Sequence, residues 1–296
     1  MAQTRTGQFP IGFRLGSYGS TWQEDLSAVV AFCVEEGFES IDGVSDPDEI
    51  KQATSAGLRI GEGALLGTGR MVSADAAERK DAAQSRAEHV RKVVPLGVRN
   101  FCLTISPTNP QEPDRSATFK FAVDSYGQLC SLIEDTGAHI VLEPYPGKQP
   151  RYANLGCTPE SLRSLFKEIG SDVMGVNFDP SHLIWTGIDT VRFVHEFADR
   201  IYHIHAKDTQ ILDDNLYDCG NLQDHTYPTN ENYGGRSWRY TLPGHGVARW
   251  EKYFEILEER SYRGVVSIEH EDWRFYGSDE LNKTALRAGR DFLKYV

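Results

Sequence analysis

The sequence predicts an α/β fold in which eight strands close into a single barrel. Strand-like and helix-like segments alternate along all 296 residues, which is typical of parallel strands with helices packed outside the sheet. Four of the strand-like segments end in a carboxylate or an imidazole, and groups at successive strand ends converge far more readily in a closed barrel than in an open sheet. The turn after the first strand, LGSYGSTW at 15–22, also lacks the G-x-G-x-x-G pattern of an open dinucleotide-binding sheet.

The eight strands are expected at short runs rich in apolar residues, with helical patterns between them. The runs are 12–17, 38–43, 58–66, 98–105, 139–145, 174–179, 201–207 and 265–271, and the helical patterns cover 73–94, 116–136, 159–169, 189–199, 249–261 and 278–294. A further helix between the first two strands is predicted by a capping box of Thr21 with Glu24 and by Gly37 at its end. Thr158 followed by Pro159 predicts a cap and a proline at the first helical position.

One segment, 209–243, interrupts this alternation after the seventh strand. It is polar and contains glycines, and connections of this length in a compact domain are usually functional or disordered. Its aromatic residues, Tyr227, Tyr233, Trp238 and Tyr240, favour packing. We therefore expect a long loop insertion that forms an ordered lid or a subunit contact, within one barrel domain that spans residues 1–296.

The composition favours a cytoplasmic protein that acts on a small molecule. The net charge of −12 argues against a nucleic-acid partner, because phosphate binding depends on clusters of Lys and Arg. The five cysteines are scattered without a C-x-x-C pair, which is typical of reduced thiols. No run approaches the roughly 18 apolar residues that cross a membrane, and the first residues lack the apolar core of a signal peptide.

The four strand ends carry the groups that bind a divalent metal. They are Glu143 in HIVLEPYP, Asp179 in MGVNFDPSH, His205 in IYHIHAKD and Glu269 in VVSIEHED. Hard cations such as Mg²⁺ and Mn²⁺ prefer carboxylate oxygen, while an imidazole suits Mn, Co, Fe or Zn. Three carboxylates with one histidine therefore favour Mn²⁺, with Mg²⁺ or Co²⁺ as alternatives.

Strand alternation narrows the choice of ligands. His203 and His205 point to the same face, and His205 lies nearer the carboxyl end, so His203 is expected one layer down. Glu269 and Glu271 also share a face; we choose Glu269 because it ends the apolar run, and Glu271 remains an alternative. His182 lies in the loop after Asp179, where it can contact substrate without binding metal.

Simpler interpretations exist for each of these residues. An Asp or Glu that closes a strand is more often a helix cap or a surface residue than a ligand. His245, in LPGHG, is as well explained as a turn residue as by a substrate contact. Lys207 and Asp208 can form a local pair, or they can support His205 from behind. The joint pattern nevertheless favours a metal site, because perturbed titratable groups cluster at functional sites.

The stretches LEPYP, FDPSHL, HIHAKDT, LPGHG and SIEHED resemble the xylose-isomerase-like sugar phosphate isomerase/epimerase superfamily. The resemblance covers about half of the chain, from Glu143 to Asp272. It implies an eight-fold barrel, a Mn²⁺-type site on Glu143, Asp179, His205 and Glu269, and a homodimer. It also implies that Glu143 and Glu269 exchange a proton of the reacting carbon. The related DNA repair nucleases need further histidines at the early strand ends, where this chain has IGEGALLG and NFCLTISP.

Three functions are compatible with these residues. The first is a metal-dependent isomerase or epimerase that acts on a keto sugar through an enediolate, with His182, Trp185, Tyr145 and Arg151 in the sugar pocket. The second is a lyase or deglycosidase that starts with the same proton abstraction on a 3-keto glycoside and then eliminates the group β to the carbonyl. The third is a barrel that only binds a sugar, which would not need two carboxylates at a metal.

Overall fold

The computed structural model describes the whole chain apart from residues 17, 66, 149–151, 222–225 and 227–229. By its internal contacts the chain divides into two compact units. The first unit comprises residues 1–42, 179–198 and 204–296, and the second comprises residues 43–178 and 199–203. Each unit is built from parallel strands and the helices that connect them.

The sheet of the first unit has the strand order β2, β1, β11 and β8, and every pairing in it is parallel. Phe13 of β1 lies opposite Ile41 on one side and Ile268 on the other, and all three side chains are fully buried. Apolar side chains buried on parallel strands are what a core covered by helices requires. The bounds are β1 Ile11–Arg14, β2 Ser40–Asp42, β8 Ile201–Ala206 and β11 Val266–Ile268.

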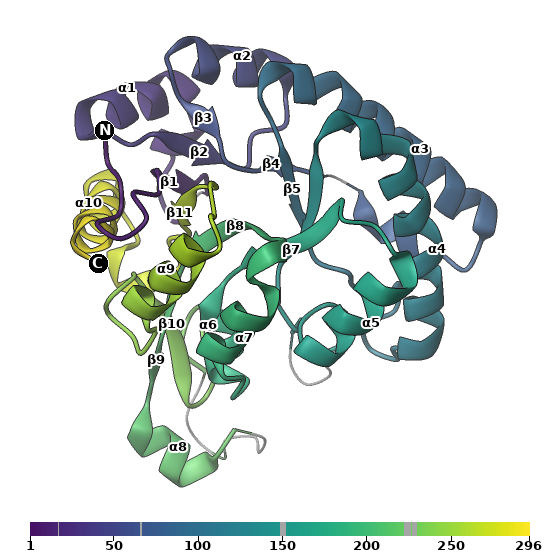
Figure 1. Cartoon of the computed structure of the whole chain (residues 1–296). Coiled ribbons are helices and arrows are strands. Elements are labelled where there is room, and N and C mark those ends of the chain that lie inside the picture. The colour runs from purple at the N-terminus through teal and green to yellow at the C-terminus, as the bar shows by residue number, and fades with distance from the viewer. Residues whose placement is uncertain (17, 66, 149–151, 222–225, 227–229) are drawn as a thin grey trace. The chain divides into compact units, whose positions relative to one another are not determined.

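The helices of the first unit include a long C-terminal helix that contacts β1 and β11 (Figure 1, yellow). The two ends of the chain also meet here, since the backbone N–H of Arg5 donates to the carbonyl of Val296 at 3.0 Å. The helix bounds are α1 Leu26–Glu36, α6 Pro180–Trp185, α7 Thr190–Phe197, α8 Asp213–Cys219, α9 Trp250–Glu259 and α10 Asp279–Tyr295, with short 3₁₀ turns at Trp22–Glu24 and Trp273–Phe275. A further 3₁₀ turn, Ala198–Arg200, has only its first residue in this unit.

The two ends of the predicted long loop form an antiparallel ribbon. Strand β9, Asp208–Ile211, pairs with β10, Trp238–Thr241, so that Tyr240 lies opposite Thr209, and α8 lies at the far end of this ribbon (Figure 1). The Trp238 ring stacks on Trp185 with centroids 4.5 Å apart. This part of the segment is therefore ordered secondary structure, whereas Tyr227 lies outside the described residues.

The second unit contains parallel strands in the order β4, β5, β6 and β7. Helices α3 and α4 pack against each other, and α5 starts at a capping box in which Thr158 and Ser161 bond reciprocally, with Pro159 at the first position as predicted. The bounds are β3 Arg59–Ile60, β4 Gly63–Ala64, β5 Asn100–Leu103, β6 His139–Leu142, β7 Met174–Phe178, α2 Pro47–Ser55, α3 Ala76–Val93, α4 Arg115–Ile133 and α5 Pro159–Ile169, with 3₁₀ turns at Thr68–Val72, Val94–Leu96 and Glu134–Thr136. Among the described residues, no helix is both long enough and apolar enough to cross a membrane.

Two details of the predicted elements were wrong. The capping box at Thr21 does not form, because Trp22 is buried in a 3₁₀ turn and its indole N–H donates to Asn282. Helix α1 is capped instead by Asp25, whose carboxylate accepts from the Ser27 N–H. The run 58–66 holds two strands of two residues each rather than one long strand, because glycines at 61 and 63 weaken a continuous strand.

The close packing of β7 generates a prediction about Gly175. A Cβ at this position would lie 2.5 Å from the carbonyl oxygen of Arg200 and would also collide with the ring of Tyr202. We expect Gly175→Ala to lower the free energy of unfolding by about 1–3 kcal/mol through overpacking, measured by urea denaturation.

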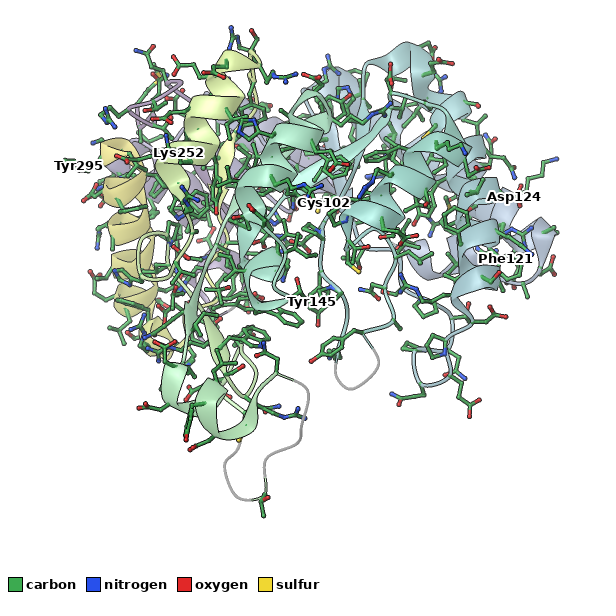
Figure 2. The ribbon with its side chains drawn as sticks, turned by 60° about the horizontal axis from the view of Figure 1, so that its bottom comes forward. Cys102, Phe121, Asp124, Tyr145, Lys252 and Tyr295 are labelled. Carbon is green, nitrogen blue, oxygen red and sulfur yellow. The ribbon has the colours of Figure 1, made fainter. Side chains whose placement is uncertain are left out.

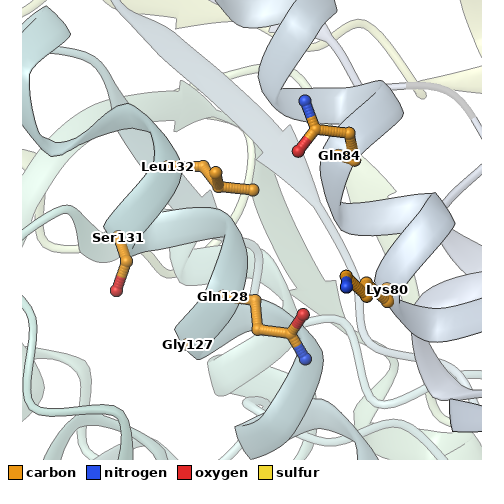
Figure 3. A pocket seen from close by; sticks show the side chains of 6 residues that line it. All are labelled: Lys80, Gln84, Gly127, Gln128, Ser131 and Leu132. Atoms are coloured by element: carbon orange, nitrogen blue, oxygen red, sulfur yellow. The ribbon is translucent and has the colours of Figure 1, made fainter. Parts of the chain in front are cut away.

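The matched control is Gly127→Ala, in the middle of α4. A Cβ at Gly127 would meet no neighbouring atom within 4 Å, since this residue faces a surface groove of about 460 Å³ next to α3 (Figure 3). This substitution should leave stability unchanged or raise it by up to about 1 kcal/mol, because alanine is the better helix former. Equal effects of the two substitutions would contradict the steric explanation.

Candidate functional site

The first unit brings the predicted groups of three strand ends into one buried cluster. Asp179 precedes α6, His205 lies near the end of β8, and Glu269 follows β11. The pairing of β8 with β11 sets Ser267 opposite His205, which places Glu269 just beyond that pair. The exposed fractions of Asp179, His205 and Glu269 are 0%, 1% and 8%, so water screens these charges poorly.

A lysine occupies the centre of this cluster. The Nζ of Lys207 lies 2.5 Å from Glu269 Oε2, 2.9 Å from Glu271 Oε2 and 3.1 Å from Asp179 Oδ2. It also lies 4.6 Å from the centre of the Tyr240 ring, within the range of a cation–π contact. Both glutamates reach the same ammonium from the residues that follow β11.

The two glutamates have pKa values shifted in opposite directions. Burial alone would raise the pKa of Glu269, but Lys207 and His205 hold it well below its usual range. Burial raises the pKa of Glu271, and Lys207 offsets only part of that effect while the charge of Glu269 adds to it. Neighbouring carboxylates with divergent pKa values are the arrangement that acid–base catalysis uses.

His205 lies between two carboxylates. Its Nδ1 is 3.4 Å from Glu269 Oε2, and its Nε2 is 3.8 Å from Asp42 Oδ2 at the end of β2. A carboxylate behind a metal-ligating histidine fixes the orientation and the tautomer of the ring. Asp42 was not predicted as a site residue, although it is a carboxylate at the end of a strand-like run, as Asp179 is.

Asp179 combines the role of a helix cap with a place in the cluster. Its Oδ1 accepts from the N–H of Ser181 at 2.9 Å and so caps α6, while its Oδ2 faces His182 Nε2 at 3.2 Å. One oxygen of this carboxylate therefore caps the helix, and the other oxygen is part of the buried cluster. The short helix α6 presents His182 to the cluster because its start is fixed by that cap.

An aromatic group from the β9–β10 ribbon completes this side of the cluster. The Tyr240 hydroxyl lies 2.7 Å from His182 Nδ1 and accepts from Trp185 Nε1 at 3.2 Å. His182 and Trp185, both predicted to bind substrate, are thus held by one buried tyrosine. Burial raises the pKa of Tyr240 well above its usual value, so its hydroxyl stays protonated at neutral pH.

Asp208, expected either to pair with Lys207 or to support His205, has partners in the turn that follows the ribbon. It accepts hydrogen bonds from the N–H groups of Thr209, Gly244 and Ala248 and from the Trp250 indole. It thereby ties the LPGHG turn to β9. His203 is fully buried on the same strand as His205 and on the same face, as strand alternation predicts.

The second unit holds the remaining predicted residues. Glu143 directly follows β6. Tyr145, labelled in Figure 2, lines a cavity of about 320 Å³ together with polar groups that include Thr104, Ser106 and Asn154. Arg151 lies outside the described residues.

The donors of the first unit fit a divalent cation. Asp179, His182 and Glu269 each offer one ligand atom, and these atoms lie within 4.8 Å of one another. Carboxylate oxygens and an imidazole nitrogen at such separations match the coordination of a hard or borderline metal. Three carboxylates, Asp179, Glu269 and Glu271, outnumber the ammonium of Lys207 and the guanidinium of Arg14, which lies 3.6 Å from Glu269, and this excess favours a bound dication.

The comparison with known families identifies the fold. A family model described as xylose isomerase-like TIM barrel matches residues 28–296. The chain belongs to this family. Its membership in the xylose isomerase-like TIM barrels confirms the predicted α/β barrel class and the resemblance found in the sequence.

Curated relatives match only part of the chain. The uncharacterized protein YfiH of Bacillus subtilis (strain 168) is 34% identical over 121 residues, which is 38% of this chain and 36% of that protein. An inosose dehydratase of Clostridium beijerinckii is 25% identical over 155 residues, 52% of this chain and 47% of that protein. The match thus covers about a third to a half of the length of these relatives.

A solved structure matches nearly the whole chain. It is the apo form of 3-keto-D-glucoside 4-epimerase, YcjR, from E. coli, with a TM-score of 0.66 at 17% identity, covering 96% of this chain and 98% of that one. At this level of identity the likeness shows a shared xylose isomerase-like fold.

The contacts of Tyr240 generate a prediction about His182. Tyr240→Phe removes the hydroxyl that bonds both His182 and Trp185, and we expect it to cost about 1–3 kcal/mol of stability because buried polar groups lose their partner. It should also change the tautomer equilibrium of His182, measured by ¹⁵N NMR of the imidazole. Tyr253→Phe, which removes one buried bond to Thr190 elsewhere in the unit, is the control and should leave the His182 signals unchanged. Unchanged His182 signals in both variants would show that Tyr240 does not orient this ring.

Proposed function

We propose that this protein is a divalent-metal-dependent isomerase or epimerase that acts on a keto sugar or a related ketone by proton abstraction. The observation that carries the proposal is the buried cluster in which Asp179 and Glu269 lie against His182 and His205. A carboxylate that is ionised, buried and close to cation ligands is suited to remove a proton from carbon.

The metal would be held by Glu143, Asp179, His205 and Glu269, and Mn²⁺ is the ion that this donor set favours. The separation of ligand atoms in the first unit supports this assignment for Asp179 and Glu269, and it makes His182 an alternative ligand to His205. A divalent ion bound there supplies Lewis acidity toward a ketone oxygen and holds the adjacent hydroxyl.

Glu269 is the base in this proposal. It takes the proton from the carbon next to the ketone and leaves an enediolate, and Glu143 returns a proton from the opposite side, which inverts the carbon centre. His182 donates or accepts a hydrogen bond at a substrate oxygen, in the orientation that Tyr240 maintains. Trp185, Tyr145 and Arg151 are proposed to line the sugar pocket.

The comparison with YcjR supports epimerisation, because that protein is described as a 3-keto-D-glucoside 4-epimerase and shares this fold. A ketone next to the epimerised carbon is the feature that makes its proton removable, and the proposed substrate has the same feature.

A second candidate is β-elimination from a 3-keto glycoside or a related ketone. It is favoured by the relative described as an inosose dehydratase, whose name denotes loss of water from a cyclic ketone. Both candidates begin when Glu269 removes a proton. They differ in whether the enediolate regains a proton or expels the group β to the carbonyl.

Deuterium exchange tests the shared first step. In D₂O with Mn²⁺ present, the protein should introduce deuterium at the carbon next to the carbonyl of at least one member of a panel of ketoses, ketose phosphates, inososes and 3-keto glycosides. Glu143→Gln and Glu269→Gln should each reduce the exchange rate about a hundredfold or more, because acid–base catalysis contributes on that order. Glu259→Gln, on the exposed side of α9, is the control and should retain full activity. Absence of exchange with every compound would refute both candidates.

Product mass separates the two candidates. Epimerisation or isomerisation of the exchanging compound should give a product of unchanged mass apart from deuterium, with a new ¹H NMR spectrum. Elimination should instead split off water or the glycosidic alcohol, and mass spectrometry of the reaction mixture would detect the smaller product. A product of lower mass would decide for the lyase.

A further inference from the structure

The ammonium of Lys207 occupies the carboxylates that the proposed metal would bind. Three carboxylates, Asp179, Glu269 and Glu271, surround Nζ of Lys207, whose residue is only 2% exposed. Two of these carboxylates are the ones expected to bind the metal. An ammonium within hydrogen-bond distance of both oxygens competes with a dication for the same lone pairs.

We propose that Lys207 is an internal counter-cation that holds the site together before the metal binds and then withdraws to Glu271. The proposal rests on the metal site of the proposed function and adds a role for two residues outside the ligand set. Lys207 acts through the ligands and is therefore a positioning residue.

The geometry explains why the lysine is needed. Without Lys207, the three carboxylates would keep, among the lysines and arginines that the structure describes, only the Arg14 guanidinium, whose Nε lies 3.6 Å from Glu269 Oε1. Removal of one partner from a buried ion pair is strongly destabilising. The ammonium satisfies this requirement with three donors, the number of carboxylates around it. The face of the Tyr240 ring, 4.6 Å away, gives the charge a further favourable contact.

The geometry also shows where the ammonium goes. Of the three carboxylate side chains, Glu271 is the most exposed, at 22% compared with 10% for Glu269 and 0% for Asp179. Glu271 is not assigned to the metal, so it can keep the ammonium while the other two carboxylates turn to the dication. A small rotation of the flexible lysine side chain would suffice, since Nζ already lies 2.9 Å from Glu271.

The test measures Mn²⁺ binding to the full-length protein by isothermal titration calorimetry. Lys207→Met should bind Mn²⁺ about tenfold more tightly, because the competing charge is gone. The same variant should unfold at a lower temperature in EDTA and gain a larger increase in Tm from Mn²⁺ than the wild type does, because an ion that binds the folded state stabilises it. Lys252→Met is the control: this lysine is half exposed and pairs with Glu255 in α9 (Figure 2), so both quantities should stay unchanged.

A double-mutant cycle tests the role of Glu271. Glu271→Gln alone should weaken Mn²⁺ binding, because the ammonium then keeps Asp179 and Glu269 as its partners. In the Lys207→Met background the same change should have a much smaller effect. An equal effect in both backgrounds would show that Glu271 acts only through its own charge and would overturn the proposal. If Lys207→Met does not fold without metal, Lys207→Gln, which removes the charge but keeps a polar side chain, takes its place in the same cycle.

The outcomes distinguish this proposal from the proposed function. If neither the wild type nor Lys207→Met binds Mn²⁺, both the metal site and the counter-cation are refuted. If the wild type binds Mn²⁺ and Lys207→Met binds it no more tightly, the metal site stands and the counter-cation is refuted. If Lys207→Met alone binds Mn²⁺, the lysine blocks the site in the wild type and the proposal is supported.

Discussion

The contact of one buried ammonium with three carboxylates is the interaction on which the site of the first unit depends. Lys207 comes from the residues after β8, Glu269 and Glu271 follow β11, and Asp179 precedes α6. Their convergence requires the parallel pairing of β8 with β11 in the observed register, because a shift by one residue would turn every side chain to the opposite face. The register of β8 with β11 therefore determines which charged side chains meet in the cluster.

The ribbon β9–β10 is part of the site rather than an appendage to the fold. Its first strand, β9, begins directly after Lys207. Its second strand, β10, places Tyr240 over the ammonium of Lys207 and against His182. Asp208 anchors the start of the ribbon through two hydrogen bonds from the turn at 244–248 and one from the Trp250 indole. The segment that interrupts the strand–helix alternation thus covers the cluster with an aromatic layer, which also lowers the local exposure to water.

The sequence predicted the strands and the residues at their ends because both follow from local rules. Apolar runs that end in Asp179, His205 and Glu269 are visible without any knowledge of pairing, and strand alternation alone separates His205 from its outward neighbours. The partners were harder to predict, because they depend on distances across the fold. Lys207 could be assigned to Asp208 next to it or to residues more than sixty positions away, and only the register of β8 with β11 decides for Glu269 and Glu271.

Contacts between residues far apart in the sequence also decide the start of α1 and the pairing of the ribbon. Thr21 with Glu24 satisfies the sequence rule for a capping box, yet the burial of Trp22 against Asn282, more than two hundred residues away, moves the start of α1 to Leu26. The ribbon residues 208–211 and 238–241 pair across a long connection that is rich in polar residues. Tertiary contacts override local preferences in both cases.

A lysine inside a metal site is a compromise between folding and binding. A cluster built only for the tightest metal binding would contain carboxylates and histidines without a competing cation, but it would place unneutralised charges in the interior whenever the chain folds without metal. A cluster with a permanent lysine would fold readily and bind a dication weakly. Glu271 resolves this conflict, since it gives the ammonium a place that is near the site but more exposed. Withdrawal of the ammonium to Glu271 would keep that carboxylate paired while Glu269 exchanges the ammonium for the metal, so each glutamate would have a cation in both states.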